Sequence, residues 1–333
     1  MRLLVLGGTG FVGGATAAEG VRRGWSVTVF NRGLHGTAPA GVHRLRGDRT
    51  APDGLAALAD GEWDVVVDTW DGAPRVAGAA AAALADRAGR YVYLSSGSVY
   101  AEPVTPGSDE DAPTVDAAPD ADEADYARNK SGAERAVHAV LGDRALLARA
   151  GLILGPGEDI GRLPWWLTRI ARGGDVLAPG PADLPLQYVD VRDLATFLLE
   201  SHASGPVNVV SRTGHATMGG LLDAAVAVTG SDARLRWTDP GALLAAGVEP
   251  WNDLPIWIPE GHEYRWLQER DVTRAYAAGL TCRPVAETVA DTWAWLREVG
   301  TVPPRAGRPQ RAPAGLDPAR EAALLAATGA APV

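Results

Sequence analysis

Residues 3–13 are LLVLGGTGFVG, and this stretch decides the fold class of the chain. The apolar run at its start predicts a buried strand, and the alanine-rich stretch that follows predicts a helix. Gly7, Gly10 and Gly13 allow, in turn, a tight turn, a close backbone approach and close packing of helix on sheet. A strand, a glycine turn and a helix N-terminus in this order predict a dinucleotide-binding loop that cradles a pyrophosphate. The candidate cofactor contacts in this loop are Gly7, Thr9, Gly10, Phe11, Val12 and Gly13.

Short apolar strands alternate with helices over the first half of the chain. Besides the first strand, Leu3–Leu6, strands are predicted at Ser26–Phe30, Val42–Leu45, Asp64–Asp68, Tyr91–Leu94 and Ala145–Leu154, and helices at Phe11–Arg23, Leu55–Leu58, Pro74–Ala88 and Tyr126–Leu141. Such alternation is typical of a parallel sheet covered by helices on both faces. We therefore predict an α/β, doubly wound parallel-sheet Rossmann fold, which binds ligands at the carboxyl ends of its strands.

The end of the second predicted strand bears on the choice of cofactor. NAD sites carry an Asp or Glu here, which binds the 2′-hydroxyl of the adenosine ribose. This chain has Asn31, which would not repel a 2′-phosphate, followed by Arg32, which can pair with one. We predict NADP(H) as the cofactor, with NAD(H) as the second choice. Asp48, after the third predicted strand, is either a contact of the adenine amino group or an ordinary turn residue.

The pattern predicts two lobes. Residues 1–154 form the NADP-binding Rossmann domain, and 186–210 return to it through strands at 187–190 and 207–210. From residue 155 the alternation loosens and tryptophans accumulate, so 155–185 and 211–300 are predicted to form a smaller C-terminal substrate-binding lobe. Residues 301–333 form a Pro/Ala-rich C-terminal tail with one amphipathic helix at 317–327.

Composition excludes several classes of function. The net charge of -10 argues against a nucleic-acid partner, since binding to phosphates needs a basic surface. The richest basic stretch, Arg305–Arg311, is embedded in Pro, Ala and Gly and is interpreted as a loose surface segment. No apolar run approaches the ~18–20 residues of a membrane span. Cys282 is the single cysteine, and the histidines lack metal-ligand spacing. We expect a cytoplasmic protein without a metal.

Tyr126 and Lys130 stand four residues apart on a predicted helix, so both project from one face. Lys130 is the sole lysine of the chain, which otherwise uses arginine at every basic position. A neighbouring ammonium lowers the pKa of a phenol, which then exchanges a proton with a carbonyl or alcohol oxygen during hydride transfer. Lys130 would also hold the cofactor ribose. Serines at the end of the strand 91–94 can donate a hydrogen bond to the same oxygen.

With these motifs in order, the chain resembles the extended short-chain dehydrogenases/reductases, also called the NAD-dependent epimerase/dehydratase family. The matching stretches are GGTGFVG at 7–13, SSGSVY at 95–100, YARNK at 126–130, GLILGP at 151–156 and QYVDVRDLA at 187–195. The resemblance implies that Ser96, rather than Ser95 or Ser98, is the catalytic hydroxyl, that Tyr126 is the acid/base and that Lys130 is its partner. It also implies a homodimer through the helices around 74–88 and 126–141.

Two positions depart from the nucleotide-sugar members of this family. Those members are expected to have an Asn where this chain has Leu152, and a diphosphate-binding Arg where it has Leu186. A diphosphate needs cationic or amide partners, so both changes argue against a nucleotide sugar, although Arg162, Arg169 or Arg192 could compensate. The candidate substrate contacts are Ser98, Arg162, Trp165 and Trp166, and Asp109–Asp111 would help to gate the pocket. Tryptophans suit a flat or apolar carbonyl compound, but they equally suit a lobe core.

Three functions fit these residues. The first is an NADP(H)-dependent oxidoreductase that reduces a ketone, or oxidises an alcohol, of a small molecule, with Tyr126 as acid/base. The alternative is a nucleotide-sugar epimerase or dehydratase with the same Ser-Tyr-Lys triad and recycled NAD. The third is a non-catalytic member that binds the cofactor as a sensor or structural partner. The intact triad and the acidic charge argue against the third.

Overall fold

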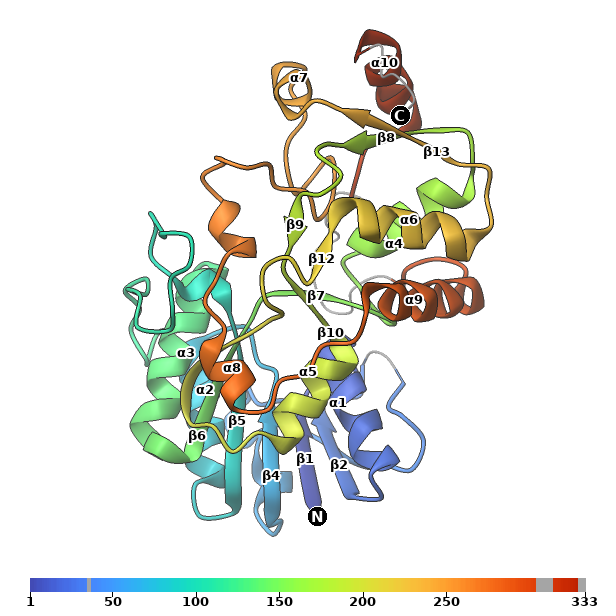
Figure 1. The fold of residues 1–333 in the computed structure, drawn as a ribbon. Coiled ribbons are helices and arrows are strands. Elements are labelled where there is room, and N and C mark those ends of the chain that lie inside the picture. The colour runs from blue at the N-terminus through green and yellow to red at the C-terminus, as the bar shows by residue number, and fades with distance from the viewer. Residues whose placement is uncertain (35–36, 304–313, 329–333) are drawn as a thin grey trace. The chain divides into compact units, whose positions relative to one another are not determined.

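The computed structural model describes residues 1–34, 37–303 and 314–328, and within them the chain divides into two compact units (Figure 1). Unit 1 comprises Met1–Gly151, Val191–Val210 and Arg270–Thr281. Unit 2 comprises Leu152–Asp190, Ser211–Glu269 and Cys282–Val333. Each unit has its own apolar core, as expected for separately packed lobes. No helix of the described residues combines the length and the apolar composition that crossing a membrane would require.

A seven-stranded parallel sheet forms the centre of unit 1. Its strands are β1 (Arg2–Leu6), β2 (Ser26–Asn31), β3 (His43–Arg46), β4 (Trp63–Asp68), β5 (Ala88–Ser96), β6 (Ala145–Ala150) and β11 (Gly205–Val209), in the order β11-β6-β5-β4-β1-β2-β3. The order reverses at β1, which pairs with both β2 and β4. In open parallel sheets ligands bind at the carboxyl ends of the strands beside such a reversal. The predicted Rossmann α/β fold is confirmed.

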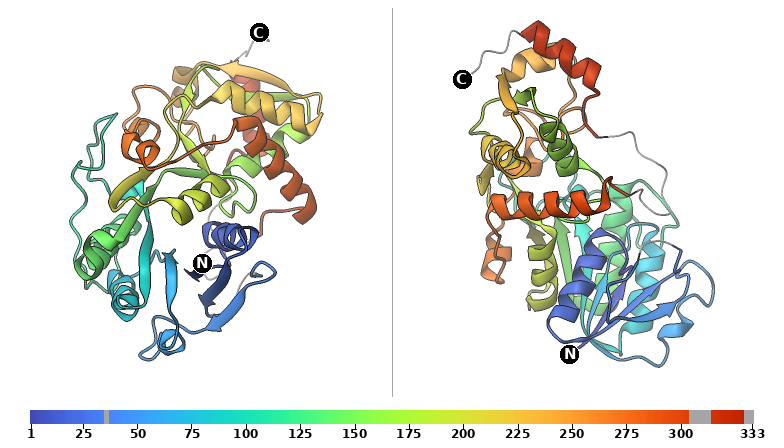
Figure 2. Two further views of the ribbon diagram at one scale, coloured as in Figure 1. Left: turned by 60° about the horizontal axis from the view of Figure 1, so that its bottom comes forward. Right: turned by 90° about the vertical axis from the view of Figure 1, so that its right-hand side faces the viewer.

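Helices cover both faces of this sheet (Figure 2). They are α1 (Phe11–Arg22), α2 (Pro74–Leu84), α3 (Tyr126–Leu141), α5 (Val191–Glu200) and α8 (Thr273–Ala277), with short 3-10 turns η1 (Ala56–Leu58), η2 (Gly97–Val99) and η3 (Gly142–Arg144). Leu4 and Leu6 share a core with alanines of α2 and α3, whereas a Cβ on Gly20 of α1 would touch Leu3. Because successive strand residues point to opposite faces, α1 lies opposite α2 and α3.

Unit 2 is built from helices and three pairs of short strands. The pairs are β7 (Leu152–Leu154) with β10 (Tyr188–Asp190), β9 (Pro185–Leu186) with β12 (Ala216–Thr217), and β8 (Asp175–Pro179) with β13 (Arg234–Thr238). The helices are α4 (Arg162–Ala171), α6 (Met218–Thr229), α7 (Pro240–Ala245), η4 (Arg265–Gln268), α9 (Val285–Val299) and α10 (Pro318–Thr328). The predicted helix at 317–327 corresponds to α10.

The structure corrects three boundaries drawn from the sequence. The single strand expected over 145–154 is broken at Gly151 into β6 of unit 1 and β7 of unit 2. The strand at 188–190 pairs with β7 and does not return to the large sheet, whereas the expected return at 207–210 occurs as β11. Residues 270–281, assigned from the sequence to the second lobe, belong to unit 1. Much of the predicted tail, including Arg305–Arg311, lies outside the described residues.

Candidate active site

The glycine loop after β1 has the conformation that its sequence predicts. Gly7 has a φ of 102°, which favours glycine, and its carbonyl accepts the N–H of Thr9 at 2.8 Å. A Cβ on Gly13 would stand 2.5 Å from the carbonyl oxygen of Gly7, so a side chain there would push α1 away from the loop. Gly13 therefore permits the close packing of the helix on the loop.

The N-terminus of α1 fits a pyrophosphate. A Cβ on Gly10 would meet nothing within 4 Å, so open space borders the backbone at this point. No side chain caps the helix and no acidic residue lies in its first turn. The unsatisfied N–H groups and the positive end of the helix dipole are therefore available to an anion. Phe11 and Val12 begin this helix, and Val12 packs its side chain into the interior.

The end of β2 lies beside two arginines. The Asn31 side chain accepts the N–H of Gly33 at 2.8 Å, which turns the chain so that Arg32 is exposed. On the neighbouring strand β3, Arg46 is paired in register with Asn31. A Cβ on Gly33 would stand 2.9 Å from Nε of Arg46, so that guanidinium lies against Gly33. Nothing in the sequence pointed to Arg46, because an arginine on a short strand carries no local signal of its role.

Asp48 follows β3 and binds its own loop. Its carboxylate accepts the N–H of Thr50 at 3.0 Å and the Thr50 hydroxyl at 2.6 Å. These hydrogen bonds hold the pKa of Asp48 below its usual value, and the charge of Arg32 acts in the same direction. Asp48 thus acts as a turn residue in this structure and still lies near Arg32.

A buried ion pair supports the same end of the sheet. Asp68, the last residue of β4, is fully enclosed and accepts Arg49 Nη1 and Nη2 at 2.6 and 2.7 Å. The Tyr91 hydroxyl donates to the same carboxylate at 2.7 Å, and the N–H of Trp70 donates at 2.9 Å. Burial alone would raise the pKa of Asp68, but Arg49 holds it below the usual value. The pair joins the loop of Asp48 to the loop of Trp70, and no local pattern of residues indicates it.

Helix α3 begins at Tyr126, where Asp125 caps it by accepting the N–H of Arg128 at 3.0 Å. Tyr126 is 45% exposed, whereas Lys130, one turn later, is 2% exposed. The Lys130 ammonium donates to the carbonyl oxygens of Trp70 and Leu94, each at 2.6 Å, and lies 4.8 Å from the centre of the Tyr93 ring. These contacts fix the ammonium at the carboxyl ends of β4 and β5, one helical turn from Tyr126.

The serine turn, residues 95–98, ends β5 and packs against α3. Ser95 is buried, and its hydroxyl finds no hydrogen-bond partner among the described residues. Ser96 points to the other side of the strand and accepts the N–H of Ser98 at 3.1 Å, while the two hydroxyls lie 3.2 Å apart. Of the three serines, Ser96 therefore has an oriented and partly accessible hydroxyl near α3, and Ser98 helps to orient it.

Three of the four substrate residues expected from the sequence, Arg162, Trp165 and Trp166, lie on α4 of unit 2, whereas Ser98 lies in the serine turn of unit 1. Trp166 is fully buried, and its indole N–H donates to the carbonyl of Pro255 at 2.8 Å. Trp166 is therefore a core residue whose side chain is not accessible to a substrate. Trp165 is partly buried and meets Trp166 edge to face with ring centroids 4.7 Å apart. The Arg162 guanidinium lies 4.6 Å from the centre of the Trp251 ring.

Glu158 caps α4 from inside the core of unit 2. Its carboxylate accepts the N–H groups of Arg162 at 2.6 Å and Leu163 at 3.2 Å, and the residue is fully buried. Burial raises its pKa from 4.5 to about 7, so the folded state binds this proton more tightly than the unfolded state. Between these two values the folded chain therefore holds more protons, and stability falls as pH rises. The displacement corresponds to about 3 kcal/mol.

Glu158→Gln is expected to remove this pH dependence. The amide does not titrate, so its free energy of unfolding should change less between pH 5 and 8 than that of the wild type, by up to about 3 kcal/mol. Urea unfolding at both pH values measures the difference. Gln loses one acceptor, so the comparison concerns the change with pH and not the absolute stability. The exposed Glu260→Gln serves as control. If the free energy of unfolding changed with pH equally in Glu158→Gln and in the wild type, the raised pKa of Glu158 would be contradicted.

Comparisons with known proteins agree with this geometry. Residues 3–210 match the sequence pattern that defines the NAD dependent epimerase/dehydratase family. No curated protein sequence matches the chain significantly. The fold is similar to that of the Bordetella bronchiseptica enzyme WbmH in complex with NAD+, with 19% identity, TM-score 0.66, and 90% and 99% of the two chains covered.

Two further solved structures share the fold. UDP-glucose 4-epimerase of Thermotoga maritima with UDP-glucose has 17% identity and TM-score 0.65, with 90% of this chain and 100% of that chain covered. UDP-glucose 4-epimerase of Thermus thermophilus in complex with NAD has 22% identity and TM-score 0.61, with 89% and 99% covered. At these identities the likeness concerns the fold.

Proposed function

Because the chain belongs to the NAD-dependent epimerase/dehydratase family, we propose that it is an NADP(H)-dependent reductase of a small-molecule ketone. The observation that carries this proposal is the end of β2, where Asn31 replaces a carboxylate and Arg32 and Arg46 flank Gly33. Guanidinium groups bind a 2′-phosphate, whereas a carboxylate would repel it. NADPH suits net reduction, while an epimerase recycles a retained NAD.

The proposed roles follow from the positions of three side chains. The nicotinamide, when bound, supplies the hydride. The Ser96 hydroxyl, oriented by the N–H of Ser98, donates a hydrogen bond to the carbonyl oxygen of the substrate. Tyr126 gives its phenolic proton to the same oxygen. Lys130, whose ammonium is fixed by two backbone carbonyls, stabilises the resulting phenolate and binds the ribose hydroxyls.

Two leucines support a substrate other than a nucleotide sugar. Leu152 and Leu186 stand where the nucleotide-sugar members are expected to use an Asn and an Arg for the diphosphate. Both side chains lie in the apolar core of unit 2, at 5% and 0% exposure. Neither can bind a diphosphate, so a ketone without this group is the better match. The homodimer expected from the resemblance stays a prediction.

The test is a fluorescence or calorimetric titration of protein freed of nucleotide with NADPH, NADH, 2′,5′-ADP and 5′-AMP. The wild type is expected to bind NADPH more tightly than NADH, and 2′,5′-ADP more tightly than 5′-AMP. Arg32→Ala and Arg46→Ala should each weaken NADPH and 2′,5′-ADP about tenfold or more, because a charged hydrogen bond is lost, with little effect on NADH. Arg22→Ala, an exposed arginine near the other end of α1, is the control.

Two outcomes would contradict the proposal. Equal weakening of NADPH and NADH by Arg32→Ala would mean that no 2′-phosphate is bound there. NAD that copurifies with the protein, together with turnover of a UDP- or dTDP-sugar without added cofactor, would identify a recycling epimerase or dehydratase. Selective NADPH binding followed by NADPH oxidation with a panel of carbonyl compounds would support the reductase.

A further inference from the structure

Arg270 is enclosed beside the serine turn. It begins the segment Arg270–Thr281, with which the chain returns to unit 1, and its side chain is 4% exposed. The guanidinium lies against two glycines at the carboxyl ends of adjacent strands. A Cβ on Gly97 would stand 1.7 Å from Nη1 of Arg270, and one on Gly151 would stand 2.9 Å from Nη2. Burial lowers the pKa of Arg270 to about 10, which still leaves it charged at neutral pH.

The space at Gly97 is defined by Arg270. The three atoms nearest to a Cβ at this position are all guanidinium atoms of Arg270. Gly97 is not among the residues with positive φ, so its backbone conformation does not itself require glycine. Gly97 lies between Ser96 and Ser98, which bond to each other across it. A glycine at position 97 therefore leaves space for the guanidinium of Arg270, which packs against the turn.

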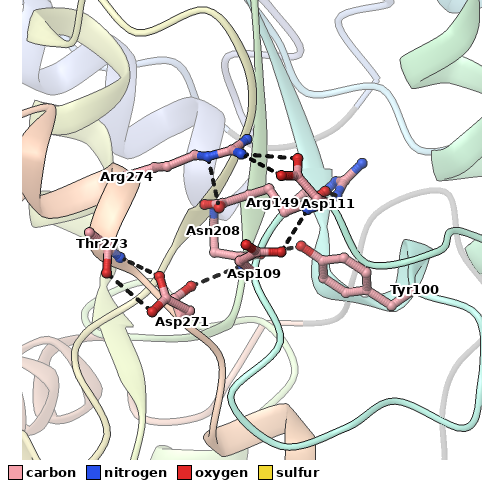
Figure 3. Close-up of polar contacts among 9 residues, drawn as sticks. Tyr100, Asp109, Asp111, Arg149, Asn208, Asp271, Thr273 and Arg274 are labelled. Carbon is pink, nitrogen blue, oxygen red and sulfur yellow. Dashed lines mark hydrogen bonds and ion pairs between the residues drawn. The ribbon is translucent and has the colours of Figure 1, made fainter.

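A chain of hydrogen bonds keeps the segment of Arg270 in place (Figure 3). The N–H of Asp271 donates to the carbonyl of Ser108 at 3.0 Å, and its own carbonyl accepts the side-chain amide of Asn208 at 3.0 Å. The Tyr100 hydroxyl donates to the Asn208 carbonyl oxygen at 2.6 Å. Both Asn208 and Tyr100 are buried, so these bonds are protected from water.

Arg274, four residues after Arg270, also holds this segment in place. It donates to both oxygens of Asp111 at 2.9 and 3.0 Å and lies 3.4 Å from the buried carboxylate of Glu110. Glu110 in turn accepts the N–H of Asn208 at 2.7 Å. The sequence suggested that Asp109–Asp111 would help to gate a pocket. In the structure the last two of these residues, Glu110 and Asp111, hold the returning segment through Arg274, and Figure 3 shows the contact between Asp111 and Arg274.

We propose that Arg270 is a positioning residue of the active site: its guanidinium fixes the turn that presents Ser96 and sets a buried positive charge beside it. This inference rests on the proposed reductase function. Negative charge develops on the carbonyl oxygen that Ser96 would bind, and a fixed cation in a low-dielectric environment stabilises such charge without reorganisation. A hydroxyl that is free to rotate would lose much of this benefit, because catalytic groups require a supported orientation.

A double-variant cycle tests the contact. Gly97→Ala is expected to lower both Tm and kcat in the wild-type background, because its Cβ meets the guanidinium. The same change should have a much smaller effect on Tm in an Arg270→Ala background, where that space is free. Equal effects in the two backgrounds would overturn the inference. This readout needs no substrate, so it holds whether or not the enzyme reduces a ketone.

Kinetics test the positioning role. Arg270→Met should lower kcat about tenfold or more, with KM and the Kd for NADPH changed less than about threefold, and Arg270→Lys should recover part of the loss. Arg90→Met is the matched control, because Arg90 lies near the start of β5 and donates to the carbonyls of Leu198 and Leu199. It should affect stability and leave kcat unchanged.

The outcomes separate this inference from the proposed function. An active wild type with an unchanged kcat in Arg270→Met overturns the positioning role and leaves the reductase intact. A wild type that binds NADPH but reduces no carbonyl compound refutes the reductase. The Tm values of the double-variant cycle then still test whether the guanidinium of Arg270 packs against Gly97. A loss of kcat in Arg270→Met that Arg270→Lys partly restores, together with a non-additive cycle, supports the inference.

Discussion

Tyr126→Phe is expected to lower kcat by about 10²–10⁴-fold, with the Kd for NADPH unchanged within about twofold. The variant removes the proton that the substrate oxygen receives and keeps the aromatic ring. Tyr126 is 45% exposed and begins α3, so the core does not depend on its hydroxyl. Steady-state NADPH oxidation with the best carbonyl substrate measures kcat, and a fluorescence titration measures the Kd.

Tyr264→Phe is the matched control, since Tyr264 is 40% exposed and lies in unit 2 beside η4. It should retain wild-type kcat. If Tyr126→Phe also retained wild-type activity, Tyr126 would not be the acid/base. If neither the wild type nor the variant acted on any substrate while both bound NADPH, the third hypothesis, a non-catalytic member that binds the cofactor, would gain support.

The sequence predicted those elements of unit 1 whose ends are determined by residues close to them in the chain. Helix α3 begins and ends where the sequence suggested, because Asp125 caps its start and Gly142, with a φ of 52°, ends it. The same holds for the glycine loop, in which each glycine relieves a nearby contact or leaves backbone open. These features depend on neighbours in sequence, so the pattern of residues suffices to predict them.

Features that depend on distant residues were missed. The apolar run on both sides of Gly151 looks like one strand, but the structure divides it there into β6 and β7, at a glycine against which the distant residue Val210 packs closely. For Trp166 the sequence left a pocket and a lobe core open, because an aromatic side chain in a sequence does not reveal which of its faces is covered, and the structure places it in the core. Arg46 and Arg270 gain their roles from contacts with glycines on other segments, which no periodicity records.

Asp68→Asn is expected to lower the free energy of unfolding by about 3–5 kcal/mol, because it breaks a buried ion pair and leaves Arg49 without its counter-charge. The Asn side chain has one acceptor oxygen in place of two. It therefore cannot satisfy both Arg49 nitrogens, the Tyr91 hydroxyl and the N–H of Trp70 at once. Urea unfolding measures the loss.

Asp64→Asn, on the same strand, is the control. Asp64 accepts the N–H of Arg2 at 2.7 Å near the surface, so this change should cost about 0.5 kcal/mol or less. The double variant Arg49→Met/Asp68→Leu should recover part of the stability, since apolar side chains of similar volume often replace a buried pair without loss. The recovery should be incomplete, because the Tyr91 hydroxyl and the N–H of Trp70 lose their acceptor.

The two variants differ in their expected effect on the cofactor. The Asp68 carboxylate orients Trp70, whose carbonyl binds the Lys130 ammonium, and Arg49 adjoins Asp48. Asp68→Asn should therefore weaken NADPH binding as well as stability, and NADPH binding should remain weakened in the double variant although part of its stability is recovered. A double variant with both wild-type stability and wild-type NADPH affinity would mean that the pair serves packing alone. Recovered stability with weakened NADPH binding would identify the pair as the support of the cofactor site.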